Sequence, residues 1–236
     1  AKISGHVERA TALSGIITAT VRDSRELITC RLNDATEADS AFQYYDRTKV
    51  LFNGADSIKT GKFAFSFAVP KDINYSDGTG LINLYAVNND KTITANGHSD
   101  HFKVGGSDVA DNDSIGPAIY CYLNSPSFEN GGNVNTTPYF VAQVKDENGI
   151  NVTGSGIGHN LELIIDGNAT MTYNLNDNFN FDFGTYKSGT TYYNIPELTE
   201  GRHKLQFRAW DILNNSSTAQ LDFNVVNRLE PNLFGV

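Results

Sequence analysis

The chain consists of short runs in which apolar and polar residues alternate, separated by turn dipeptides. In residues 62–69 (KFAFSFAV), Phe63, Phe65, Phe67 and Val69 would lie on one face of a strand. Similar runs recur at short intervals along the chain, and no long segment shows the 3.6-residue period of an amphipathic helix. This pattern predicts an all-β protein rather than a helical bundle or an α/β enzyme.

The same pattern locates strands, turns and core residues. Further strands are expected at residues 15–21, 80–87, 118–123, 139–146, 161–166, 203–211 and 217–226. Tight turns are expected at Asn53-Gly54, Asp77-Gly78, Asn96-Gly97, Asn130-Gly131, Asn148-Gly149 and Asp166-Gly167, because Asn, Asp and Gly tolerate positive φ. In the second half of the chain we expect core positions at Ile119, Val141, Ile164, Leu205 and Phe207.

A boundary is visible near the middle of the chain. The stretch 105–114 is polar, acidic and rich in small residues, which is typical of a linker. We therefore expect two tandem immunoglobulin-like β-sandwich domains, residues 1–106 and 116–228, joined by a linker at 107–115. Residues 229–236 would form a tail that leads to a following module.

Charge and hydropathy exclude several functions. The net charge is −9 and no cluster of Lys and Arg is present, so the chain lacks the electrostatic footprint of a nucleic-acid-binding protein. No apolar run is long enough to cross a membrane, and membrane insertion is not expected. No signal peptide precedes the first strand-like residues. These features predict an internal fragment of a longer protein.

No catalytic or cofactor-binding motif is present, and no residue is assigned either role. Residues 154–158 contain Gly154, Gly156 and Gly158 and are followed by His159. No helix follows, as phosphate binding would require, so we expect an irregular loop that supports the fold or contacts a partner. The two cysteines, Cys30 and Cys121, are far apart and are expected to act as small buried apolar residues.

Two weaker binding hypotheses remain open. Asp111 and Asp113 lie in the predicted linker, where carboxylates of an acidic loop could bind calcium. Tyr192 and Tyr193 would place one ring on each side of a strand, and an exposed ring could bind a carbohydrate. Apart from calcium, no cofactor is expected.

Several segments of the chain also resemble a known family when they are taken together and in order. They are residues 67–73 (FAVPKDI), 80–86 (GLINLYA), 146–151 (DENGIN), 154–159 (GSGIGH), 201–205 (GRHKL) and 209–216 (AWDILNNS). They resemble the region that follows the catalytic domain in the gingipain-type cysteine peptidase family. The resemblance is greatest to the sortase members of that family, which act in the type IX secretion system of Bacteroidetes.

The resemblance implies a function without implying an active site in this chain. The catalytic Cys and His of the family lie in a caspase-like domain that would precede residue 1, so the parent chain would be a cysteine peptidase and this part would not be catalytic. We expect an accessory region at the cell surface, associated with the outer membrane. Its partners would be the upstream caspase-like domain, cargo proteins or other secretion components. The alternative is an independent surface adhesin or carbohydrate-binding module.

Overall fold

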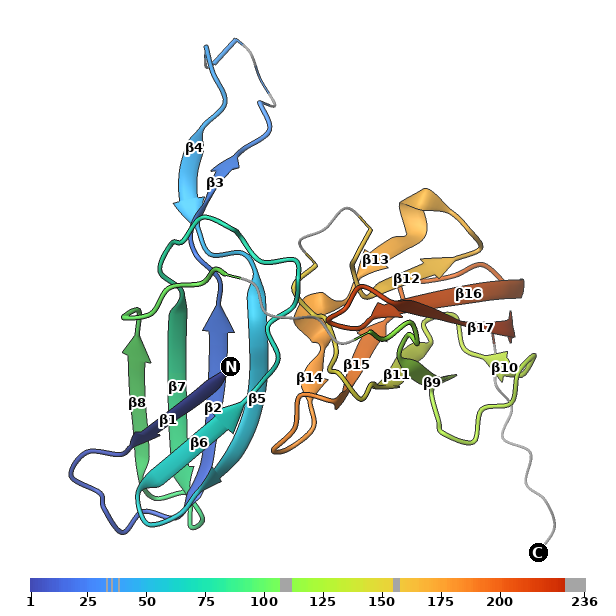
Figure 1. The fold of residues 1–236 in the computed structure, drawn as a ribbon. Helices are drawn as coiled ribbons and strands as arrows, with labels where there is room; N and C mark the ends of the chain where they lie inside the picture. The colour runs from blue at the N-terminus through green and yellow to red at the C-terminus, as the bar shows by residue number, and fades with distance from the viewer. Residues whose placement is uncertain (33, 35, 38, 107–111, 155–157, 228–236) are drawn as a thin grey trace, which may run out of the picture. The chain divides into compact units, whose positions relative to one another are not determined.

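The computed structural model describes residues 1–227 except 33, 35, 38, 107–111 and 155–157. The regular secondary structure of the described residues is almost entirely β-strand, which confirms the predicted all-β class. Helix is limited there to two short 3-10 turns, η1 (Ala169–Met171) and η2 (Asn176–Asn178), and no described helix is long and apolar enough to span a membrane. The chain divides into two compact units, Ala1–Asp111 and Asn112–Val236 (Figure 1).

The predicted linker and tail lie mostly outside the described residues. Residues 107–111 of the linker and 229–236 of the tail are not described. The described remainder of the linker, residues 112–115, belongs to the second unit. There Asp113 accepts a hydrogen bond from the backbone N–H of Ile115 at 3.0 Å, so this part of the chain has local structure.

The first unit contains eight described strands. They are β1 (Lys2–His6), β2 (Gly15–Arg22), β3 (Glu26–Thr29), β4 (Gln43–Asp46), β5 (Val50–Ile58), β6 (Lys62–Ser66), β7 (Leu81–Asn88) and β8 (Thr94–Ser99). An antiparallel sheet has the order β5-β2-β7-β8, and β1 pairs with β6. The Phe52 ring of β5 contacts Phe65 and Phe67, so an aromatic core joins β5 to β6 and the residues that follow it.

The strands β3 and β4 pair only with each other, in a separate two-stranded hairpin (Figure 1). Every residue of β4 is exposed, including Tyr44 and Tyr45. An isolated hairpin buries little apolar surface, which explains why neither of its faces forms a core.

Two of the predicted turns are wrong. Asn53-Gly54 lies inside β5 and Asn96-Gly97 inside β8. At Gly54, a Cβ atom would lie 2.5 Å from the ring of Phe52. The glycine is therefore needed because the aromatic ring two residues earlier covers the strand, and no turn is required there.

The second unit is a sandwich of two sheets. Its strands are β9 (Ala118–Leu123), β10 (Asn133–Val134), β11 (Tyr139–Lys145), β12 (Glu162–Ile165), β13 (Thr172–Asn174), β14 (Asn180–Phe181), β15 (Ser188–Asn194), β16 (Gly201–Trp210) and β17 (Ser216–Val225). One sheet has the order β10-β17-β16-β12-β13, and the other has the order β14-β15-β11-β9. The Phe140 and Phe207 rings meet between the sheets, with centroids 5.3 Å apart.

The core predictions for this unit are correct in part. Leu205 and Phe207 are fully buried. Ile164 and Ile119 are only half-buried, and in β12 the buried positions are Leu163 and Ile165. Since successive side chains of a strand point to opposite faces, an error of one residue reverses the assignment. In the first unit Val69 is likewise exposed, because β6 ends at Ser66.

The two cysteines differ in their surroundings. Cys30 is exposed, contrary to expectation, while Cys121 on β9 is half-buried, and both are free thiols. Burial raises the pKa of the Cys121 thiol to about 11. Cys121 therefore stays protonated at neutral pH and is a poor nucleophile.

Candidate functional site

The main candidate site is a group of three aspartates in the second unit, here called the acidic cluster: Asp113, Asp146 and Asp211. Asp113 precedes β9, Asp146 follows β11 and Asp211 follows β16. One carboxylate oxygen from each lies within 4.8 Å of the other two, and both Asp146 and Asp211 are buried. The site therefore gathers three carboxyl groups from distant parts of the sequence.

Backbone contacts hold the two buried aspartates side by side. Ile150 and Asp211 form an isolated antiparallel bridge, and the N–H of Ile212 donates to the carbonyl of Gly149 at 3.1 Å. The loop that follows β11 is thereby attached to the end of β16. Gly149 has a φ of +117°. A residue with a side chain would be strained in this conformation, so glycine suits this turn.

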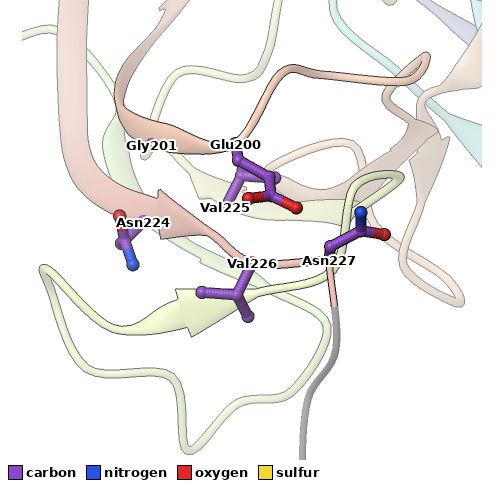
Figure 2. Close-up of a pocket in the computed structure, with 6 residues that line it drawn as sticks. All are labelled: Glu200, Gly201, Asn224, Val225, Val226 and Asn227. Atoms are coloured by element: carbon purple, nitrogen blue, oxygen red, sulfur yellow. The ribbon is translucent and has the colours of Figure 1, made fainter.

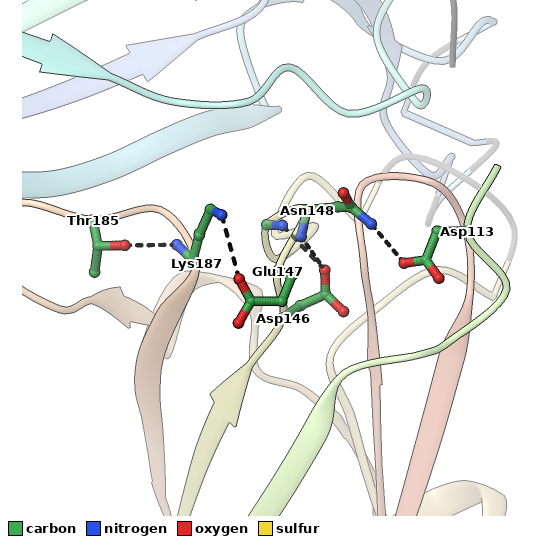
Figure 3. Close-up of polar contacts among 7 residues, drawn as sticks. Asp113, Asp146, Glu147, Asn148, Thr185 and Lys187 are labelled. Carbon is green, nitrogen blue, oxygen red and sulfur yellow. Dashed lines mark hydrogen bonds and ion pairs between the residues drawn. The ribbon is translucent and has the colours of Figure 1, made fainter. Parts of the chain in front are cut away.

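Asp146 organises its own loop. One of its carboxylate oxygens, Oδ1, accepts hydrogen bonds from the backbone N–H of Asn148 at 2.7 Å and of Gly149 at 3.1 Å. The side-chain amide of Asn148 in turn donates to Oδ2 of Asp113 at 2.5 Å (Figure 3). Asn148 thus links two members of the acidic cluster.

Asp211 organises the opposite loop. Its Oδ1 accepts from the backbone N–H of Leu213 at 2.9 Å and of Asn215 at 2.7 Å. The Asn215 amide donates to Oδ2 of Asp211 at 2.8 Å and to the carbonyl of Asp113 at 3.1 Å. Asn148 and Asn215 are therefore the two amides that tie the cluster together.

The acidic cluster has no positively charged partner among the described residues. Its neighbour Glu147 pairs with Lys187 at 3.5 Å (Figure 3), but the three aspartates form no ion pair in the described chain. Burial raises the pKa of Asp146, and repulsion from Asp211 and Asp113 adds to this, while the N–H groups of Asn148 and Gly149 lower it. The ionised form of Asp146 is therefore disfavoured.

The donor set of the cluster consists of oxygen atoms, which suits a hard cation. Two oxygens bound to one Ca²⁺ at about 2.3–2.6 Å can lie up to about 5 Å apart, and the separations in the cluster fall within that limit. Calcium also accepts carboxylates that keep hydrogen bonds to other groups. The residues fit calcium on both spacing and chemistry.

Sequence reasoning identified part of this site. It named Asp113 together with Asp111, and Asp111 lies outside the described residues. It missed the participation of Asp146 and Asp211. The available signal was that both are followed by asparagine-rich turns, DENG and DILNN, but their proximity depends on the pairing of distant strands.

The glycine-rich loop is described only at its ends, because Gly156 falls outside the described residues. Gly154 has a φ of +58° and Gly158 a φ of +87°. The ring of His159 lies 4.3 Å from that of Trp210, and the Arg208 guanidinium lies 5.7 Å from the same ring. His159 therefore packs against the end of β16.

The two predicted carbohydrate tyrosines point to opposite sides of β15. Tyr192 is 43% exposed on the outer face of the sandwich. Tyr193 points toward the other sheet, where its ring lies 4.8 Å from that of Tyr173. Burial, with a contribution from Tyr173, raises the pKa of Tyr193.

An open pocket lies at the end of β17 (Figure 2). Its lining residues are Glu200, Gly201, Asn224, Val225, Val226 and Asn227. They include one carboxylate but no Cys, His, Ser or Lys, so this lining contains no pair of nucleophile and base for covalent catalysis.

Comparison with known proteins gives one informative match. No family model matches the chain, and no curated protein matches it. Among solved structures, the chain is similar to a crystal structure of dimeric latent PorU from Porphyromonas gingivalis, with 37% sequence identity over 98% of this chain. The chain is therefore similar in sequence to a part of PorU.

The match concerns only a part of PorU. This chain spans 22% of the length of the PorU chain, and the TM-score is 0.49. The activity of the complete PorU protein is therefore only proposed for this chain.

Proposed function

We propose that this chain is a non-catalytic β-sandwich region of a PorU-like cysteine peptidase of the gingipain type. It would act at the cell surface in type IX secretion, where it would orient the protease domain or dock cargo. The observation that carries the proposal is the 37% identity to PorU over 98% of the chain. The raised pKa of Cys121 supports a non-catalytic role, because a thiol that stays protonated is a poor nucleophile.

Cargo processing by the parent protein tests this proposal. Deletion of residues 1–236 from the parent peptidase is expected to reduce the cleavage of cargo signals at the cell surface. The purified 236-residue chain is expected to cleave no cargo. Both results follow if the region positions a catalytic domain that lies elsewhere in the parent.

The matched control is the double variant Cys30→Ser, Cys121→Ser in the complete parent protein. It is expected to process cargo at the normal rate, because neither thiol takes part in catalysis. Loss of processing in this variant, or cleavage of cargo by the isolated chain, would show that the region itself is catalytic.

We also propose that the acidic cluster binds Ca²⁺ and that the ion stabilises the loops of the second unit. The specific observation is that Asp146 and Asp211 are buried and Asp113 half-buried, within 4.8 Å of one another and without an ion pair in the described chain. Buried charges that lack a partner are costly, and a bound cation would offset that cost.

Calcium is expected to raise the melting temperature of the second unit at pH 7. Surface modules bind Ca²⁺ with dissociation constants of about 10⁻⁴–10⁻³ M, so 10 mM Ca²⁺ would stabilise the unit by about 1.4–2.7 kcal/mol. Asp146→Asn is expected to abolish this response, while Glu147→Gln keeps it, because Glu147 is exposed and pairs with Lys187. A response to Mg²⁺ equal to that for Ca²⁺, or one that Asp146→Asn leaves intact, would contradict the site.

The stabilisation by calcium is expected to weaken as the pH falls. Because the pKa of Asp146 is higher in the folded than in the unfolded chain, the folded state without calcium binds more protons in the window between the two values. The stability of this state therefore rises as the pH falls from neutral through the folded pKa of Asp146 toward 3.8, the ordinary pKa of an aspartate. Protons then compete with calcium, so melting curves with and without Ca²⁺ should converge as the pH falls into the acidic range.

A further inference from the structure

One face of the second unit carries an unusual group of aromatic side chains. We call it the tyrosine face, and it consists of Tyr120 and Tyr122 on β9, Tyr139 and Val141 on β11, and Tyr192 on β15. It is the outer face of the sheet β14-β15-β11-β9 (Figure 1). The opposite face of the same sheet carries Phe140, which packs against Phe207 in the core.

Strand register brings these side chains together. Val141 lies directly opposite Tyr122 on one side and Tyr192 on the other. The rings of Tyr139 and Tyr192 have centroids 6.1 Å apart and are inclined by 31°, and those of Tyr120 and Tyr122 are 5.7 Å apart. Val141 is only 8% exposed, because the tyrosines on both sides cover it.

The rings nevertheless remain accessible. Tyr120 is 52% exposed, Tyr192 is 43% exposed and Tyr139 is 36% exposed. The hydroxyl of Tyr120 donates to the carbonyl of Pro126 at 2.9 Å, which fixes that ring. The face thus offers a partly ordered aromatic surface.

Polar groups without charge complete the tyrosine face. Gln143 lies opposite Tyr120 and Thr190, and Asn194 lies opposite Tyr139. The side chains of these three polar residues form no hydrogen bond with the described part of the chain, so they are available to a ligand. The charged strand position on this face is Lys145, at the end of β11.

This chemistry matches a neutral sugar chain. Aromatic rings carry a negative face that attracts the C–H groups of a sugar ring, and amide and phenol groups bind hydroxyls as donors or acceptors. A polyanion would need several basic side chains, whereas the face carries one lysine in a chain of net charge −9. We propose that the tyrosine face binds a neutral oligosaccharide.

Native gel electrophoresis through soluble polysaccharides tests this proposal on the 236-residue chain. The probes are yeast mannan, dextran, xyloglucan and mixed-linkage β-glucan, with alginate as the anionic comparison. At least one neutral polysaccharide is expected to retard the chain, and alginate is not. Tyr192→Ala and Tyr139→Ala are each expected to weaken the retardation at least tenfold.

Two further variants separate binding from folding. Tyr85→Ala removes a 52% exposed tyrosine from β7 in the first unit and is expected to leave retardation unchanged. Tyr192→Phe keeps the ring and is expected to keep most of the binding, with a melting temperature close to that of the parent chain.

Three results would overturn the proposal. One is the absence of retardation by all four neutral polysaccharides, and another is retardation that survives both alanine substitutions. The third is a dimer in analytical ultracentrifugation that Tyr192→Ala dissociates, because the face would then be covered by a second copy of the chain. None of these results bears on the relationship to PorU, so this inference and the proposed function can fail separately.

Discussion

Phe207→Ala is expected to destabilise the second unit by about 3–5 kcal/mol, the usual cost of removing a buried phenylalanine ring. Phe207 is fully buried and its ring packs against Phe140 across the two sheets. A small side chain would leave a cavity where the sheets meet, and rigid strands cannot close over it. The melting temperature of this unit should fall by roughly 10 °C or more.

Differential scanning calorimetry checks this expectation and also the division of the chain. Phe207→Ala should move one transition, while Phe65→Ala, which opens the core of the first unit, should move the other. The control Phe183→Ala removes a ring that is 58% exposed and should change the free energy of unfolding by less than about 0.5 kcal/mol. A joint shift of all transitions in Phe207→Ala would mean that the units do not unfold independently.

Gly154→Ala is expected to destabilise the second unit by about 2–3 kcal/mol. The positive φ of +58° costs an L-residue about 1–2 kcal/mol. In addition, a Cβ atom would lie 1.8 Å from the amide nitrogen of Asn176. The Asn176 side chain accepts a hydrogen bond from the N–H of Leu161 at 2.7 Å, and displacing it would cost about 1 kcal/mol more.

Gly158→Ala is the matched control for this contact. Gly158 also has a positive φ, of +87°, but a Cβ atom there would meet no atom of the described residues within 4 Å. The control should therefore show only the backbone cost, and urea unfolding of both variants measures the difference. Equal losses in the two variants would show that Asn176 moves aside without cost.

Local sequence patterns predicted the strands more reliably than the residues that face the core. Strand 118–123 has the predicted bounds, and the strands near 139–146 and 203–211 differ by one or two residues. Asn-Gly pairs were less reliable, since they also serve inside strands where a neighbouring aromatic ring needs space, as at Gly54. A dipeptide carries no information on the side chain that packs over it.

The candidate sites depended much more on tertiary structure. Sequence reasoning named Tyr192 and Tyr193 together, without choosing between them, and the neighbours of Tyr192 on the tyrosine face lie more than 50 positions away along the chain. Tyr139 could be placed beside Tyr192 only through the pairing of β11 with β15. Register over such distances is set by the packing of both sheets, which short-range patterns do not encode.

The sequence by itself determined the all-β class and most strand positions. These properties follow from local periodicity and from residue identity, which can be read without a structure. Tertiary structure alone decided that Asp113, Asp146 and Asp211 converge and that four tyrosines share one face. The reason is physical: each of these groups forms across strands that are distant in sequence, and only the closed sandwich brings them within contact distance.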